Sequence, residues 1–102
     1  MAKKQNRQPS IIQSNRESYL TGKTCGILDP HEPIGGHNRQ TSIKEGLWIW
    51  VTREEHDWLH ETEEGQIKDA ELSALMEREW YKHTGKSKED WYRLFYKHYD
   101  LD

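Results

Sequence analysis

The chain has 102 residues, of which 32% are hydrophobic and 32% are charged, and its formal net charge is −3. This length predicts one domain with a small core, and the five Trp and five Tyr residues argue against full disorder because aromatic side chains bury large areas. The single cysteine, Cys25, excludes an intramolecular disulfide and a four-cysteine zinc ribbon. The sequence has neither a signal-peptide pattern nor an apolar stretch of about 18 residues, so we expect a cytoplasmic protein without a membrane partner.

Charge is unevenly distributed along the chain. Residues 1–44 hold seven Lys or Arg and three Asp or Glu, a balance of +4, whereas residues 45–102 hold eight and fifteen, a balance of −7. Two explanations account for this asymmetry equally well. The basic half faces phosphate groups, or both halves are ordinary solvated surfaces. Residues 1–18 are polar and basic apart from one pair of isoleucines, and we predict a flexible basic arm there, followed by one domain over residues 19–102.

The first strand is predicted at residues 27–31, which begin with an apolar pair. Two prolines and two glycines within residues 30–36 exclude a helix and predict that the strand end runs into a shaped loop. Three side chains in this stretch are able to bind a metal or transfer a proton, namely Asp29, His31 and Glu32. Residues 37–42 are polar and are predicted to extend the loop.

Residues 46–51 (GLWIWV) form the strongest strand pattern, because they are β-branched or aromatic and lie between a glycine and a helix cap. Side chains alternate along a strand, so Leu47, Ile49 and Val51 point to one side and the two tryptophans to the other. Both sides are apolar, and we expect both to be covered. Pairing with residues 27–31 gives a two-stranded ribbon with a long connecting loop.

Thr52 and Glu55 have the spacing of a capping box and predict the start of a short helix at residues 53–60. His56 and His60 then lie one turn apart on the same face, close enough to bind one ion. Two histidines of one helix do not complete a metal site, so a third ligand from the ribbon is required. The alternative is a pair of solvated histidines, since this spacing is common by chance.

Two further helices are predicted in the C-terminal half. Residues 61–66 form a polar connector, after which Asp69 caps a helix that runs to about residue 84 and ends at Gly85. A second cap at residues 87–90 opens the last helix. Each helix has an apolar stripe that we assign to the core: Leu72, Leu75, Met76 and Trp80 in the first, and Trp91, Leu94, Phe95 and His98 in the second.

Several segments, in order and at matching spacing, resemble the HNH (ββα-metal) endonuclease superfamily, and most closely its small phage and prophage proteins. They are residues 28–42 (LDPHEPIGGHNRQTS), residues 46–51, the helical histidines and the tail at residues 95–101 (FYKHYDL). The resemblance covers residues 19–101. It implies an α+β fold with a ββα-metal core at about residues 25–62 and C-terminal helices at about residues 68–99. The function it implies is metal-dependent hydrolysis of phosphodiester bonds in DNA, carried out in a bacterial host cell.

The resemblance also implies roles for the site residues. His31 matches the first histidine of the family pair, a metal ligand, and His56 and His60 match the helical histidines that complete the site. Glu32 stands where the family has a histidine that acts as general base. A second alignment makes Asp29 the metal ligand and His31 the base, and the ungapped alignment is the favoured one. One divalent ion is expected, with Mg²⁺ first and Zn²⁺, Mn²⁺ or Ni²⁺ as alternatives.

Phosphate contacts are expected from the loop and its surroundings. Asn38 and Arg39 match the Asn-Arg pair of the family loop, which holds the loop or contacts phosphate, and Lys23 and Lys44 add positive charge. Gly46 falls near the position of the asparagine that orients the base in typical members, so Glu32 lacks its usual tether unless Asn38 replaces it.

Three hypotheses follow from the sequence. The first is an active HNH-type nuclease with DNA as partner. The second is a catalytically weak or inactive module of the same fold that binds nucleic acid or protein, because the base position is altered and the C-terminal half is acidic. The third is a metal-free helical protein with surface histidines. A homodimer or a phage protein partner is compatible with the first two.

Overall fold

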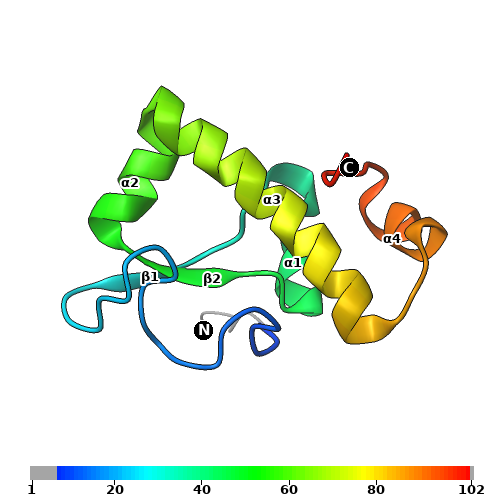
Figure 1. Ribbon diagram of the computed structural model, residues 1–102, viewed down its shortest axis with the longest axis horizontal. Helices are drawn as coiled ribbons and strands as arrows, with labels where there is room; N and C mark the ends of the chain where they lie inside the picture. Colours follow the sequence, from blue (N-terminus) through cyan, green and yellow to red (C-terminus); the bar gives the residue numbers. More distant parts are fainter. Residues whose placement is uncertain (1–6, 102) are drawn as a thin grey trace, which may run out of the picture.

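A two-stranded antiparallel ribbon forms the centre of the fold, as shown in Figure 1. The computed structural model describes residues 7–101. Strand β1 (Leu28–His31) pairs with strand β2 (Ile49–Thr52), with Leu28 opposite Thr52 and His31 opposite Ile49. The predicted ribbon and the α+β class are therefore confirmed.

The segment predicted as an extended loop is partly helical. Residues Gly36–Asn38 form a 3-10 turn, η1, and Arg39–Glu45 form helix α1. Local sequence does not reveal this helix because its support is tertiary: Ile43 is buried in the core, and the Ser42 hydroxyl donates a hydrogen bond of 2.7 Å to the Ile34 carbonyl. Gly46 ends α1 in the left-handed conformation at φ 73°, so β2 begins three residues later than predicted.

Both sides of β2 are covered, as its sequence predicts. Leu47, Ile49 and Val51 are fully buried on the core side. The tryptophan side is covered by the N-terminal segment, in which the Gln8 carbonyl accepts a hydrogen bond from Trp48 Nε1 at 2.7 Å. Residues 7–18 of the predicted arm therefore pack on the domain, while residues 1–6 lie outside the described part of the chain.

Helix α2 (Arg53–Glu61) begins where the capping box predicts. The Thr52 hydroxyl accepts from the Glu55 amide at 3.1 Å, and the Glu55 carboxylate accepts from the Thr52 amide at 2.8 Å. This cap fixes the direction in which the first turn of α2 leaves the ribbon. The rotation of α2 about its axis, and so the face that carries its histidines, follows from that start.

Helix α3 (Glu63–Thr84) follows α2 almost directly, so the predicted connector at residues 61–66 is wrong. The Thr62 hydroxyl caps α3 by accepting from the Gly65 amide at 2.9 Å. Gly65 is a close-packing glycine and not a helix breaker: a Cβ there would lie 2.6 Å from the carbonyl carbon of Trp58. Asp69, predicted as the cap, instead lies inside α3.

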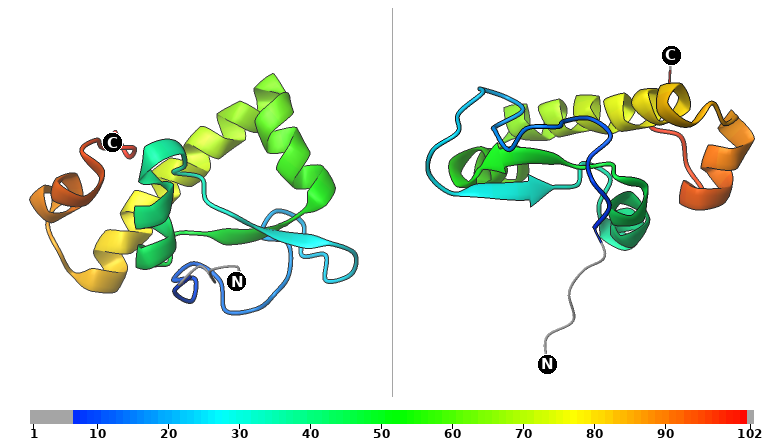
Figure 2. Two further views of the ribbon diagram at one scale, coloured as in Figure 1. Left: turned by 180° about the vertical axis from the view of Figure 1, so that it is seen from behind. Right: turned by 90° about the horizontal axis from the view of Figure 1, so that it is seen from below.

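The C-terminal part holds helix α4 (Lys88–Phe95), which starts at a capping box on Ser87, as predicted. α3 ends at Gly85 as predicted, whereas α4 ends earlier than predicted because Tyr96 adopts the left-handed conformation at φ 61°. Figure 2 shows α3 as a long helix that runs from its junction with α2 toward α4. The strands, the helices and the loop after β1 contribute to one core, which contains Ile34, Leu47, Ile49, Val51, Leu59, Leu72, Met76, Trp80, Trp91 and Phe95. None of the helices described here has the length and apolar character needed to cross a bilayer.

Candidate metal centre

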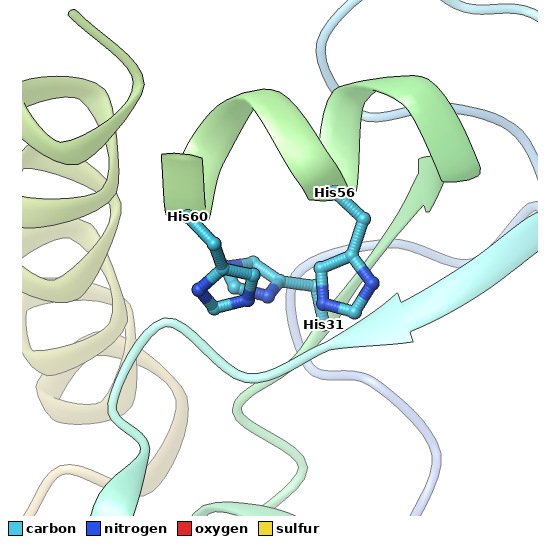
Figure 3. Close-up of side chains that lie close together, drawn as sticks. All are labelled: His31, His56 and His60. Carbon is cyan, nitrogen blue, oxygen red and sulfur yellow. The ribbon is translucent and has the colours of Figure 1, made fainter. Parts of the chain in front are cut away.

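Three histidines meet where the end of β1 faces α2, as Figure 3 shows. One ring nitrogen from each of His31, His56 and His60 lies within 4.8 Å of the other two. The ring centroids are 4.9–5.4 Å apart. His31 is only 2% exposed, His56 is half-buried and His60 is exposed, so the cluster opens from the core to the surface. The structure thus brings together the two helical histidines and the ribbon histidine that the sequence singles out.

These residues fit a metal ion by donor type and spacing. Imidazole suits zinc, nickel and other transition ions. Bonds of about 2.0–2.1 Å in tetrahedral geometry put nitrogen pairs roughly 3.3 Å apart. The three nitrogens lie within 4.8 Å of one another, so they must move closer together to hold an ion. Ligand imidazoles must be neutral. Burial lowers the pKa of His56 below its ordinary value, and the charges of His31 and His60 lower it further, so His56 is neutral at neutral pH.

Asp69 joins the site from α3 and is the main residue that the sequence analysis misses. Its Oδ1 lies 2.7 Å from Nε2 of His31, and its side chain is 22% exposed. A carboxylate only accepts hydrogen bonds, so His31 donates Nε2–H and keeps its lone pair on Nδ1. The sequence offers one signal for this contact, because Asp69 stands one helical turn after Gly65. The prediction of a connector at residues 61–66 places Gly65 outside the helix, so it does not use that signal.

Asp29 lies at the edge of the cluster and is held by an arginine. Arg53 donates from Nη2 to Oδ1 at 3.1 Å and from Nε to Oδ2 at 3.3 Å, and Nδ1 of His56 lies 3.5 Å from Oδ2. The hydrogen bonds from Arg53 lower the pKa of Asp29, against a smaller opposing effect of burial. Asp29 is therefore ionised and occupied by Arg53, and it is not part of the group of mutually close ligand atoms found in the described residues.

Comparison with known proteins adds no relative. No family model, curated protein or solved structure matches this chain. The function must therefore be inferred from the geometry of the site and from the contacts of the residues around it.

Glu32, expected at the position of the general base, is engaged elsewhere. Its carboxylate forms an ion pair with Arg7 and accepts from Arg39 Nε at 2.9 Å, and its side chain is only 6% exposed. The Arg7 guanidinium lies 5.1 Å from the ring centroid of Trp48. Glu32 thus belongs to the tryptophan side of the ribbon, as alternation from His31 requires. Its contacts tie the N-terminal segment to the loop.

The expected phosphate-binding residues divide into two groups. Asn38 is buried, and its Nδ2 donates to the Phe95 carbonyl at 3.1 Å and to the Tyr99 hydroxyl at 3.2 Å, so it holds the loop against the C-terminal segment. Arg39, Lys23 and Lys44 are exposed. Arg53 is a further cation that the sequence analysis misses: its side chain is 59% exposed, and it stands one turn before His56 at the edge of the cluster.

Proposed function

We propose that this chain is a metal-dependent endonuclease that hydrolyses phosphodiester bonds in DNA, built on an HNH-like ββα core. The observation that supports this best is the meeting of His31 from a strand end with His56 and His60 from the following helix. Three protein ligands are typical of catalytic metal sites, which keep a coordination position for water or substrate, whereas structural zinc sites are closed by four.

The ligand set favours a transition ion such as Zn²⁺ or Ni²⁺ over the Mg²⁺ that is the first expectation from the sequence, because Mg²⁺ prefers oxygen ligands. When bound, such an ion stabilises negative charge on the phosphate and lowers the pKa of water. The protein supplies the neutral imidazoles that hold it, with His31 offering Nδ1 because Asp69 takes Nε2–H.

The remaining roles belong to residues at the edge of the cluster. Arg53 presents a partly exposed guanidinium beside His56, suited to a phosphate oxygen, and Asp29 fixes its orientation through two hydrogen bonds. Glu32 is not proposed as the base, because both of its oxygens face arginines.

A second candidate is a module of the same fold that binds nucleic acid without cutting it. The observation that favours it is the engagement of Glu32 with Arg7 and Arg39, which leaves the usual base position without a free proton acceptor. This candidate keeps the histidine cluster and the exposed cations but lacks hydrolysis.

The direct experiment is incubation of supercoiled plasmid with the purified full chain and Zn²⁺, Ni²⁺, Mn²⁺ or Mg²⁺ in turn. We expect nicking with at least one ion, and its loss in His56→Ala and His60→Ala. His83→Ala is the matched control, because His83 is exposed at the far end of α3, and it should nick like the wild type. Absence of nicking with every ion, or equal nicking by His56→Ala, contradicts the proposal.

Mobility-shift assays at two salt concentrations separate the two candidates. Uncut DNA that is bound with a steep salt dependence supports the binding module, since phosphate contacts release counterions. Calorimetric titration with Zn²⁺ completes the set: one ion per chain in the wild type and none in His56→Ala is the result that either metal-binding candidate requires.

A further inference from the structure

We infer that Asp69 is a positioning residue of the metal centre, which selects the ring nitrogen that His31 presents to the ion. The expected effect on metal binding rests on the proposed function, whereas the position of the ring proton on His31 is a property of the metal-free protein. The 2.7 Å contact between Asp69 Oδ1 and His31 Nε2 has the length of a charge-assisted hydrogen bond. It confines the ring proton to Nε2 and leaves Nδ1 as the only nitrogen of His31 with a free lone pair.

Asp69 is held in place by contacts on both sides of it along α3. One turn before it, Gly65 sits against the backbone of Trp58, where no Cβ atom fits. One turn after it, the Ser73 hydroxyl lies 3.1 Å from the carbonyl of Pro33, two residues beyond His31. The same hydroxyl lies 3.1 Å from the Asp69 carbonyl. The strand end that carries His31 and the helix that carries Asp69 are therefore tied directly to each other.

The burial of the pair increases the effect. His31 is 2% exposed, so water has little access to compete for Nε2–H. His56 has a weaker counterpart, because Nδ1 lies 3.5 Å from Asp29 and that carboxylate is shared with Arg53. Asp69 is thus the carboxylate whose removal should matter most.

Carboxylates that hold the second nitrogen of a ligand histidine fix the ring and raise its basicity, and their loss typically weakens metal binding by about 10–100-fold. We expect Asp69→Asn and Asp69→Ala to weaken Zn²⁺ or Co²⁺ binding by about that factor. Glu71→Ala is the matched control: Glu71 lies two residues along the same helix, its side chain is 65% exposed, and its removal takes away the same charge. It should bind like the wild type.

The test combines metal titration with nuclear magnetic resonance of the metal-free full chain labelled with ¹⁵N-histidine. Long-range proton–nitrogen spectra, recorded where the imidazoles are neutral, distinguish the Nε2–H from the Nδ1–H tautomer. We expect His31 to be Nε2–H in the wild type and in Glu71→Ala, and to become a mixture in Asp69→Ala. Asp69→Asn keeps the side-chain shape, so that a folded variant is available if Asp69→Ala does not fold.

The two readouts separate this inference from the proposed function. A wild-type His31 in the Nδ1–H form overturns the inference, and so do Asp69 variants that bind the ion as tightly as Glu71→Ala. If the wild type takes up no ion while the tautomer still depends on Asp69, the proposed function fails and the positioning of His31 by Asp69 stands.

Discussion

Substitution of Gly65 by Ala tests whether the crossing of α2 and α3 positions the candidate metal centre. Gly65 is buried in the first turn of α3, and a Cβ atom there would lie 2.6 Å from the Trp58 carbonyl carbon and 2.8 Å from the Leu59 Cα. Carbon atoms in contact are normally about 3.5–4.0 Å apart. All of these neighbours are backbone atoms, so no side-chain rotation relieves the overlap, and the helices must separate by roughly 1 Å.

The expected cost is large for a domain of this size. Overpacking costs about 1–3 kcal/mol or more, and the better helix propensity of Ala offsets at most about 1 kcal/mol. We expect a net loss of about 2 kcal/mol in the free energy of unfolding, and a fall in Tm of about 8–16 °C. Asp69 lies one turn beyond Gly65, so separation of the helices also stretches its hydrogen bond to His31, and Zn²⁺ affinity should fall by about tenfold.

Thermal unfolding followed by circular dichroism, with a chelator present, measures the first effect, and Zn²⁺ calorimetry measures the second. Gly35→Ala is the matched control: its φ is −104°, and the nearest atom to a Cβ there, the Glu32 carbonyl oxygen, lies 3.8 Å away. It should change the free energy of unfolding by less than about 0.5 kcal/mol. A Gly65→Ala protein with the Tm and Zn²⁺ affinity of the wild type would refute the reasoning.

Three further predictions concern the helix start, the edge of the cluster and the C-terminal segment. Thr52→Ala removes the cap of α2 and should lower the free energy of unfolding by about 0.5–2 kcal/mol in a urea titration. Arg53→Ala should weaken DNA binding and reduce its salt slope by about 1, as measured by mobility shift. Burial raises the pKa of Glu77, but hydrogen bonds from Tyr81 and the C-terminal segment outweigh it and lower the pKa overall. The stability due to the Glu77 carboxylate is therefore present above the ordinary Glu pKa and is lost as the pH falls through the lowered pKa of Glu77 in the folded protein. The urea concentration at the unfolding midpoint should therefore fall less steeply with acidification in Glu77→Gln than in the wild type.

The parts of the fold that sequence predicts are those with local chemical signals. The capping box at Thr52 and Glu55, the αL glycine at Gly85 and the alternation of residues 47–51 each depend on neighbours in the chain, and all three are confirmed. Helix α1 has no side-chain cap, and it is stabilised by the burial of Ile43. A pattern of local residues gives no sign of such support, so the sequence alone predicts a loop in this segment.

The contrast between local signals and tertiary support also explains which part of the candidate site can be predicted from the sequence. His56 and His60 are neighbours on one helix, and His31 ends the strand that the ribbon places beside that helix, so their meeting follows from local patterns and one pairing. Asp69 contacts His31 from α3, which crosses α2 at backbone contact where Gly65 has no Cβ. Glycine often ends a helix, and it is also the residue that allows two helices to cross at backbone contact. The sequence around Gly65 does not show which of these two roles it has. Histidines carried by consecutive elements are thus predictable, whereas the carboxylate that contacts one of them from a third element depends on an interhelical distance.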